Sequence, residues 1–202
     1  MKIKPLERAF QRQHTKRSKT DLLVIHHGAS AISFKAEDYH DWHIARGFYG
    51  VGYNFVIEWD GTIKQGRPIW AVGAHSKPVN TTSIGVCLVG NFQHHRPSHD
   101  QYKAFAWLCN NVITKEYSNL KIVGHFDTDA TACPGIQFSF KHMSDYIKEG
   151  VEQVEKWKTD LMQKAHDLEL IDLAHGHKPD ETATKWFVLA IGINILKKLG
   201  GK

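Results

Sequence analysis

A histidine and a cysteine eight residues apart, His125 and Cys133, carry the clearest chemistry in this sequence. Imidazole nitrogen and thiolate sulfur are both good zinc ligands. The residues Lys121-Ile-Val123 before the histidine are typical of a short strand, and Pro134-Gly135 after the cysteine favour a turn. Because a strand end followed by a bent loop can return to one point, we expect the two side chains to converge.

A catalytic zinc site uses three protein ligands and leaves one position for water, so a third ligand must come from elsewhere. His26 and His27 follow the apolar run Leu22-Leu-Val-Ile25, which predicts a buried strand. Ligand sites in open α/β sheets tend to lie at strand ends. Neighbouring residues of a strand point to opposite faces, so only one of these histidines can reach a metal. The alternative is a pair of solvent-facing or core histidines.

Seven groups of residues fall in a fixed order between residues 20 and 148. They are Val24-Ile-His-His-Gly-Ala29, Trp42-His43 with Gly47-Phe48, Val51-Gly-Tyr-Asn-Phe-Val-Ile57, Asp60-Gly61-Thr62, Ala71-Val-Gly-Ala-His75, Asn80 with Ser83-Ile-Gly-Val-Cys-Leu-Val-Gly90, and Gly124-His125 with Ala132-Cys-Pro-Gly135. Together they resemble the zinc-dependent N-acetylmuramoyl-L-alanine amidase family, a superfamily that includes some bacteriophage lysozymes and the peptidoglycan recognition proteins. Seven ordered matches are far more specific than one motif.

The resemblance implies hydrolysis of the amide between N-acetylmuramic acid and the L-alanine of the stem peptide. It also implies three zinc ligands, His26, His125 and Cys133, because the family's first ligand is the histidine directly after the apolar strand. Tyr53 matches the family's active-site tyrosine in the motif Gly-x-Tyr-x-Phe.

One position departs from the bacteriophage members, many of which carry a lysine two residues before the cysteine ligand. This chain has Thr131 there, as catalytic recognition proteins tolerate, and its hydroxyl would stabilise an oxyanion less strongly than a cation. Three further residues are candidates for substrate contact. His43 lies on a helix that borders the family's substrate groove, and His75 and Asn80 lie on loops, where binding groups are often placed.

Strands that alternate with helices predict an α/β domain with a mixed central sheet flanked by helices. We expect strands near residues 22–25, 50–59, 62–65, 83–89 and 122–123, with a hairpin turn at Asp60-Gly61. Helices are expected at 36–46, capped by Ser33, and at 101–116, capped by Ser98. The predicted organisation is a basic N-terminal arm (1–20), a zinc amidase domain (21–148) and a helical extension (149–202).

The composition is basic, with a formal net charge of +5 and a pI near 9.0. Such a balance favours anionic partners, here the cell envelope rather than nucleic acid. Three cysteines are no disulfide framework and fit synthesis in a reducing compartment. No conventional secretory signal is seen. Together with the family resemblance, these features lead us to expect a monomer that is made in the cytoplasm of a bacteriophage-infected cell and acts on the cell wall. Residues 1–20 are expected to be a solvated arm or a contact for a polyanion or partner protein.

The apolar run Trp186–Leu196 is too short to span a bilayer, because 11 residues of helix reach about 16 Å and the hydrocarbon core is about 30 Å thick. Lysines at both ends, Lys185, Lys197 and Lys198, suit a cationic amphipathic helix at an anionic membrane surface, residues 185–199. The alternative is a helix that packs on the preceding ones.

Two other functions share this fold: a non-catalytic peptidoglycan-binding protein, and a lysozyme homologue that regulates a polymerase. A protein that only binds its target could lose a zinc ligand, and here all three are present. The complete ligand set therefore favours the hydrolase, with Zn²⁺ as its cofactor. A third possibility is a cationic protein that acts on membranes through its C-terminal helix alone.

Overall fold

The computed structural model describes residues 1–152 of the 202-residue chain. Residues 1–147 form one compact unit and residues 148–202 a second. The predicted helical extension therefore lies outside the described residues from residue 153 onward, as does the predicted cationic helix at 185–199. Among the described helices, none is long and apolar enough to cross a membrane.

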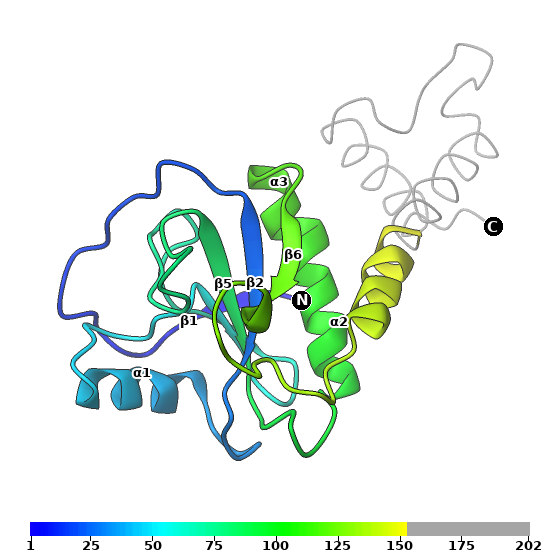
Figure 1. The fold of residues 1–202 in the computed structure, drawn as a ribbon, viewed down its shortest axis with the longest axis horizontal. Helices are drawn as coiled ribbons and strands as arrows, with labels where there is room; N and C mark the ends of the chain where they lie inside the picture. Colours follow the sequence, from blue (N-terminus) through cyan, green and yellow to red (C-terminus); the bar gives the residue numbers. More distant parts are fainter. Residues whose placement is uncertain (153–202) are drawn as a thin grey trace, which may run out of the picture. The chain divides into compact units, whose positions relative to one another are not determined.

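A six-stranded sheet forms the centre of the first unit, in the order β1-β4-β3-β5-β2-β6 (Figure 1). Only β3 and β4 pair antiparallel, through the predicted hairpin turn, and the other neighbours pair parallel. The predicted mixed sheet is therefore confirmed. The strands are β1 (Ile3–Pro5), β2 (Leu22–His27), β3 (Phe55–Ile57), β4 (Ile63–Gln65), β5 (Ser83–Leu88) and β6 (Lys121–Gly124).

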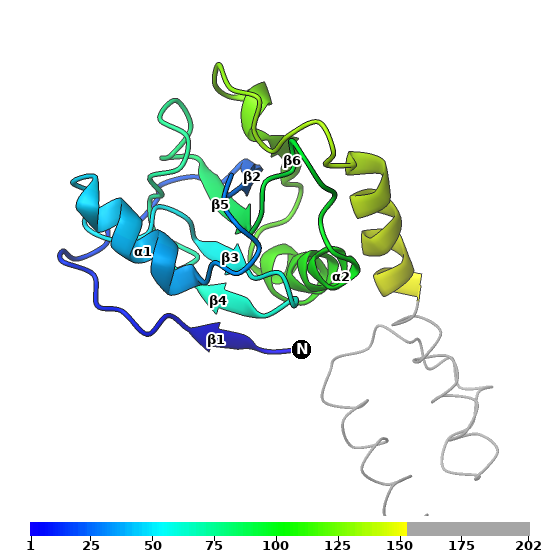
Figure 2. The same cartoon turned by 90° about the horizontal axis from the view of Figure 1, so that it is seen from below.

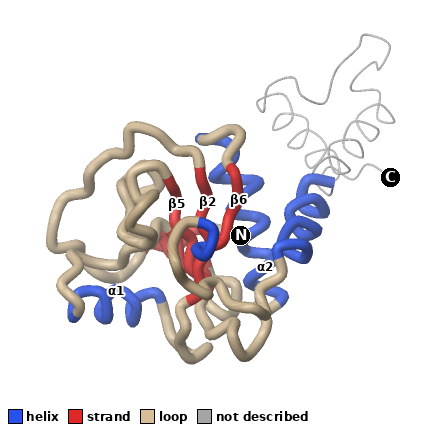
Figure 3. Tube along the Cα trace, viewed as in Figure 1, coloured by secondary structure: helices blue, strands red, loops and turns tan. Residues whose placement is uncertain are grey.

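Two main helices cover opposite faces of this sheet (Figure 2). Helix α2 (His99–Leu108) continues through a π-helical turn (Cys109–Ile113) into α3 (Thr114–Glu116), and packs on the face that carries the larger apolar core. Helix α1 (Ala36–Ala45) packs on the other face, over a smaller apolar cluster. Much of the chain between these elements is loop (Figure 3).

The central strands follow from their sequences. All six residues of β5 are buried, as expected for an apolar strand between two parallel neighbours. In β2, Leu23 and Ile25 join the larger core, so the alternate residue His26 faces the α1 side. Ser98 caps α2 as predicted, since its Oγ accepts a hydrogen bond from the Gln101 backbone N at 3.0 Å.

Two predictions about the helices are wrong. Helix α1 is capped by the Asp38 carboxylate, which accepts from the Lys35 backbone N at 2.7 Å, rather than by Ser33. The second helix starts at residue 99 and changes to π-helical geometry at Cys109 instead of running regularly over 101–116. Side-chain hydrogen bonds and tertiary packing decide both features, and neither is visible in the apolar periodicity.

The predicted strand at 50–59 is regular only from Phe55 to Ile57. Before it, the backbone N–H groups of Val51 and Gly52 donate to side chains, His40 Nδ1 at 3.3 Å and His43 Nδ1 at 2.9 Å, and only Asn54 N donates to β5, to the Gly85 carbonyl at 2.9 Å. A Cβ at Gly52 would lie 2.1 Å from the Ala74 carbonyl oxygen, so this close approach requires glycine. Residues 51–54 therefore form a mostly buried irregular segment between α1 and β3.

The N-terminal segment, residues 3–17, is bound along the domain, which contradicts the expected solvated arm. Strand β1 pairs with β4, and the Arg17 and Val72 backbone N–H groups donate to Trp70 and Thr15 carbonyls. Arg17 is only 6% exposed, and its guanidinium donates to the carbonyls of Ile69 and Ala71. The positive charges of this segment thus partly serve packing.

Candidate metal centre

His26 reaches the site from near the C-terminal end of β2, which lies between β5 and β6. It lies in register with Cys87 of β5, is 2% exposed, and faces the α1 side. Its neighbour His27 faces the larger core, where its Nδ1 accepts from the Phe92 backbone N at 2.9 Å. The prediction that only one of the two histidines can reach the metal position agrees with this arrangement.

His125 and Cys133 come from the loop that follows β6, the strand next to β2. The strand ends at Gly124, and a short 3₁₀ turn, His125–Asp127, starts there. The chain then bends back, and the Phe126 backbone N donates to the Cys133 carbonyl at 2.8 Å. This bond closes the loop and brings both side chains to one point, as the sequence predicts.

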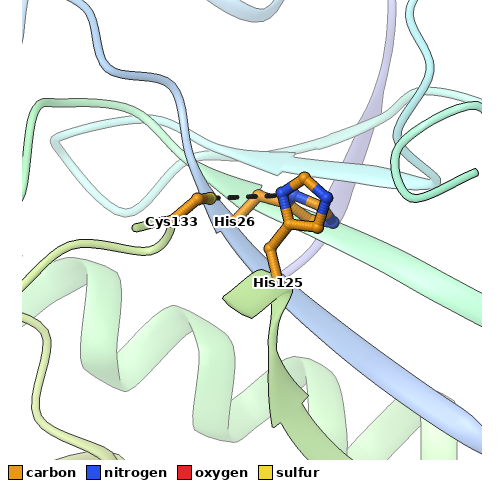
Figure 4. A group of neighbouring side chains, drawn as sticks. All are labelled: His26, His125 and Cys133. Carbon is orange, nitrogen blue, oxygen red and sulfur yellow. Dashed lines mark hydrogen bonds between the residues drawn. The ribbon is translucent and has the colours of Figure 1, made fainter. Parts of the chain in front are cut away.

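The three side chains point toward one another (Figure 4), and one donor atom from each lies within 4.8 Å of the other two. His26 Nδ1 is 3.8 Å from Cys133 Sγ, and the two histidine ring centroids are 4.4 Å apart. Tetrahedral zinc with ordinary bond lengths places nitrogen and sulfur ligands about 3.5 Å apart. His125 Nε2 is also buried without a hydrogen-bond partner, with the Asp129 carboxylate 3.9 Å away. The geometry, the unpartnered nitrogen and the donor types therefore fit zinc.

Burial sets the protonation of these groups. Desolvation, with smaller contributions from neighbouring histidines, holds the pKa of His26 well below 6.5, and desolvation also lowers the pKa of His125. Burial raises the pKa of the Cys133 thiol to about 11, opposed by the His27 backbone N–H, which donates to the sulfur at 3.3 Å. Both imidazoles are thus neutral and able to coordinate at pH 7, whereas the thiol must lose a proton.

Tyr53 lies beside this group, with its ring centroid 5.1 Å from that of His26 and 5.6 Å from that of His43. Burial, reinforced by the nearby Cys87 and Cys133 thiols, raises its pKa well above 10. The phenol therefore keeps its proton at neutral pH, and in this structure that proton is shared with the Cys87 thiol.

Thr131 is exposed on the metal-site loop, and its Oγ1 accepts from the Cys133 backbone N at 3.2 Å. The hydroxyl proton remains free to point outward. His43 is buried, and its ring lies near those of Trp42 and Phe48, which are themselves partly exposed. Its Nδ1 is occupied by Gly52, so its Nε2 is the nitrogen left for a ligand.

His75 and Asn80, predicted to contact substrate, are engaged inside the protein. His75 Nδ1 lies 3.0 Å from His26 Nε2, and His75 Nε2 lies 3.4 Å from Ser83 Oγ. Asn80 Oδ1 accepts from the backbone N atoms of His75 and Ser76 at 2.8 and 3.0 Å. Both ring nitrogens of His75 have protein partners, so a substrate contact through His75 stays a prediction that is limited to its ring carbons. A contact through the Asn80 side-chain NH₂ group stays a prediction.

The sequence profile described as N-acetylmuramoyl-L-alanine amidase matches residues 16–136, which are more than half of the chain. The chain belongs to the N-acetylmuramoyl-L-alanine amidase family. All three candidate metal ligands fall inside the matched residues.

Individual relatives agree with this assignment. An endolysin of Klebsiella phage KP32 is 33% identical over 128 residues, which are 60% of this chain and 85% of the endolysin. A peptidoglycan-recognition protein of Drosophila melanogaster is 35% identical over 124 residues, which are 57% of this chain and 68% of that protein. Among solved structures, N-acetylmuramoyl-L-alanine amidase LysC from Clostridium intestinale superposes with a TM-score of 0.68 at 28% identity, covering 73% of this chain and 98% of LysC.

Proposed function

We propose that this amidase-family chain is an endolysin-like peptidoglycan hydrolase that uses zinc held by His26, His125 and Cys133. The bond cut is the amide between N-acetylmuramic acid and L-alanine. The observation that carries the proposal is the convergence of one sulfur and two nitrogen donors within 4.8 Å, from segments about a hundred residues apart. Family membership and the endolysin relative support the same reaction.

When bound, zinc would polarise the scissile carbonyl and lower the pKa of a coordinated water. The protein's own side chains then decide how charge is stabilised. Tyr53 keeps its proton and is buried next to His26, so it is placed to donate a hydrogen bond to the developing oxyanion. Thr131 offers a second, neutral donor from the solvent side of the loop.

Beside Tyr53 lies an aromatic wall made by Trp42, His43 and Phe48, with the His43 ring centroid 5.6 Å from that of Tyr53. The His43 ring lies nearly parallel to both neighbours, with interplanar angles of 29° to Trp42 and 28° to Phe48. Exposed aromatic surface beside a polar ring nitrogen suits a sugar, which presents both C–H faces and hydroxyls. We assign this wall to binding of the glycan next to the scissile bond.

A protein that only binds peptidoglycan is the second candidate, since recognition proteins are among the relatives. The complete donor set favours hydrolysis, because binding alone does not require three converging ligands. We further propose that the protein is made in the cytoplasm of an infected cell and acts on the cell wall. Residues 185–199 would contact the membrane. A polymerase-regulating role has no separate support in the described residues.

Mass spectrometry of digested peptidoglycan tests the reaction directly. The expected products are free stem peptides that begin with L-alanine, and glycan strands whose sugar linkages are intact. Metal analysis is expected to give about one zinc per chain, lost in Cys133→Ser and kept in the control Cys109→Ala, whose thiol is buried in the other core. Binding to peptidoglycan without release of peptides would favour the binding protein.

A further inference from the structure

The proposed ligand His26 begins a continuous chain of hydrogen bonds that runs through His75 and Ser83, away from the metal position. His26 Nε2 lies 3.0 Å from His75 Nδ1, and His75 Nε2 lies 3.4 Å from Ser83 Oγ. Ser83 Oγ in turn donates to the Val79 carbonyl oxygen at 2.6 Å. The opposite nitrogen of His26, Nδ1, is the one that faces Cys133.

The carbonyl at the end of this chain fixes the direction of every bond. A carbonyl oxygen only accepts, so the single hydroxyl proton of Ser83 must point to Val79. Ser83 Oγ can then only accept from His75, which places the His75 proton on Nε2. His75 Nδ1 is left as an acceptor for a proton on His26 Nε2. His26 Nδ1 consequently carries a free lone pair, directed toward the proposed metal position.

The protein is shaped to hold His75 in this place. A Cβ on Gly73 or on Gly85 would lie 2.3 Å from the His75 ring, so both positions need glycine to admit it. Asn80 Oδ1 fixes the backbone of His75 by accepting its N–H, and Ser83 is fully buried. The ring therefore has one position and two defined partners.

We propose that His75 and Ser83 are positioning residues that fix the tautomer and ring orientation of His26 for metal binding. This inference rests on the proposed function, because it assigns a purpose to residues behind the same ligands. Histidine ligands commonly donate their second N–H to a carboxylate, a carbonyl or water. Here the acceptor is a neutral imidazole, so orientation is supplied without adding negative charge to a site that already contains a thiolate.

Zinc affinity of the full-length chain, measured by competition with a chromogenic chelator, tests the role of His75. His75→Phe fills similar space but cannot accept the hydrogen bond, and we expect zinc to bind about 10- to 100-fold more weakly. His75→Asn restores an acceptor near the Nδ1 position and is expected to recover affinity to within about tenfold of the parent. Ser98→Ala, which removes the cap of α2 far from the site in sequence, controls for general destabilisation and should bind zinc like the parent.

Nitrogen-15 NMR of histidine-labelled, zinc-loaded parent protein tests the direction of these hydrogen bonds without any substitution. The inference predicts protons on Nε2 of both His26 and His75, and Ser83→Ala is expected to lose the single tautomer at His75. A proton on His75 Nδ1 in the parent, or unweakened zinc binding in His75→Phe, would overturn the inference. A parent that binds no zinc would instead overturn the proposed function.

Discussion

The raised pKa of Cys133 makes zinc binding a proton-releasing reaction. With a pKa of about 11, the thiol is ionised in about one molecule in 10⁴ at pH 7. The histidine ligands bring no protons, because burial lowers the pKa of both below 6.5. Since the metal binds the thiolate, each zinc should displace about one proton at pH 7, and affinity should rise about tenfold per pH unit while the thiol remains protonated.

Calorimetric titration of the zinc-free chain in buffers of different ionisation enthalpy measures that proton directly. We expect about one proton per zinc at pH 7, together with a dissociation constant that falls about tenfold from pH 6.5 to 7.5. Cys109→Ala should give the same result, since its thiol is buried away from the site. Release of less than half a proton would refute the reasoning, because the thiolate would then exist before the metal binds.

Three substitutions test the surroundings of the site. Tyr53→Phe should keep one zinc but reduce turnover of purified peptidoglycan about 100-fold or more, as loss of an oxyanion donor does elsewhere, whereas an unchanged rate would exclude that role. Gly52→Ala should lower the free energy of unfolding by about 1–3 kcal/mol in urea, since its Cβ would meet the Ala74 carbonyl; an unchanged midpoint would contradict the close packing. Desolvation lowers the pKa of His43 to about 4, so its neutral form stabilises the fold fully above pH 6.5 and that stabilisation is lost as the pH falls toward 4. Between pH 7 and pH 5, the free energy of unfolding of His43→Gln should therefore fall by about 2 kcal/mol less than that of the parent. Equal decreases in the two proteins would show that His43 does not titrate this way.

The proposed metal-binding residues could be predicted from the sequence because strand alternation and the bend at Pro134-Gly135 are local properties. Alternation separates His26 from His27, and the parallel pairing of β2 with β6 then places His125 beside His26. The convergence of these segments was still an inference from the family resemblance, since spacing alone does not say which strands are neighbours.

The residues around the metal position were less predictable because loop packing determines their roles. The sequence predicts only that His75 lies in a loop. The folded chain shows that its two ring nitrogens contact His26 and Ser83. The sequence of the N-terminal segment predicts a polar arm because charge dominates its composition. Phe10 was the one residue that could have indicated packing on the domain, since its ring packs against Gly50 and His40 in the structure.

Strand β1 has a consequence for how copies of the protein meet. It is an edge strand of only three residues. Lys4 is charged and Pro5 has no backbone N–H to donate, so both disfavour pairing with another chain. A truncation before residue 6 would bare β4, whose Ile63 and Lys64 pair with β1, and would leave an open hydrogen-bonding edge. Such shortened chains are expected to self-associate on concentration, so expression designs should retain the first five residues.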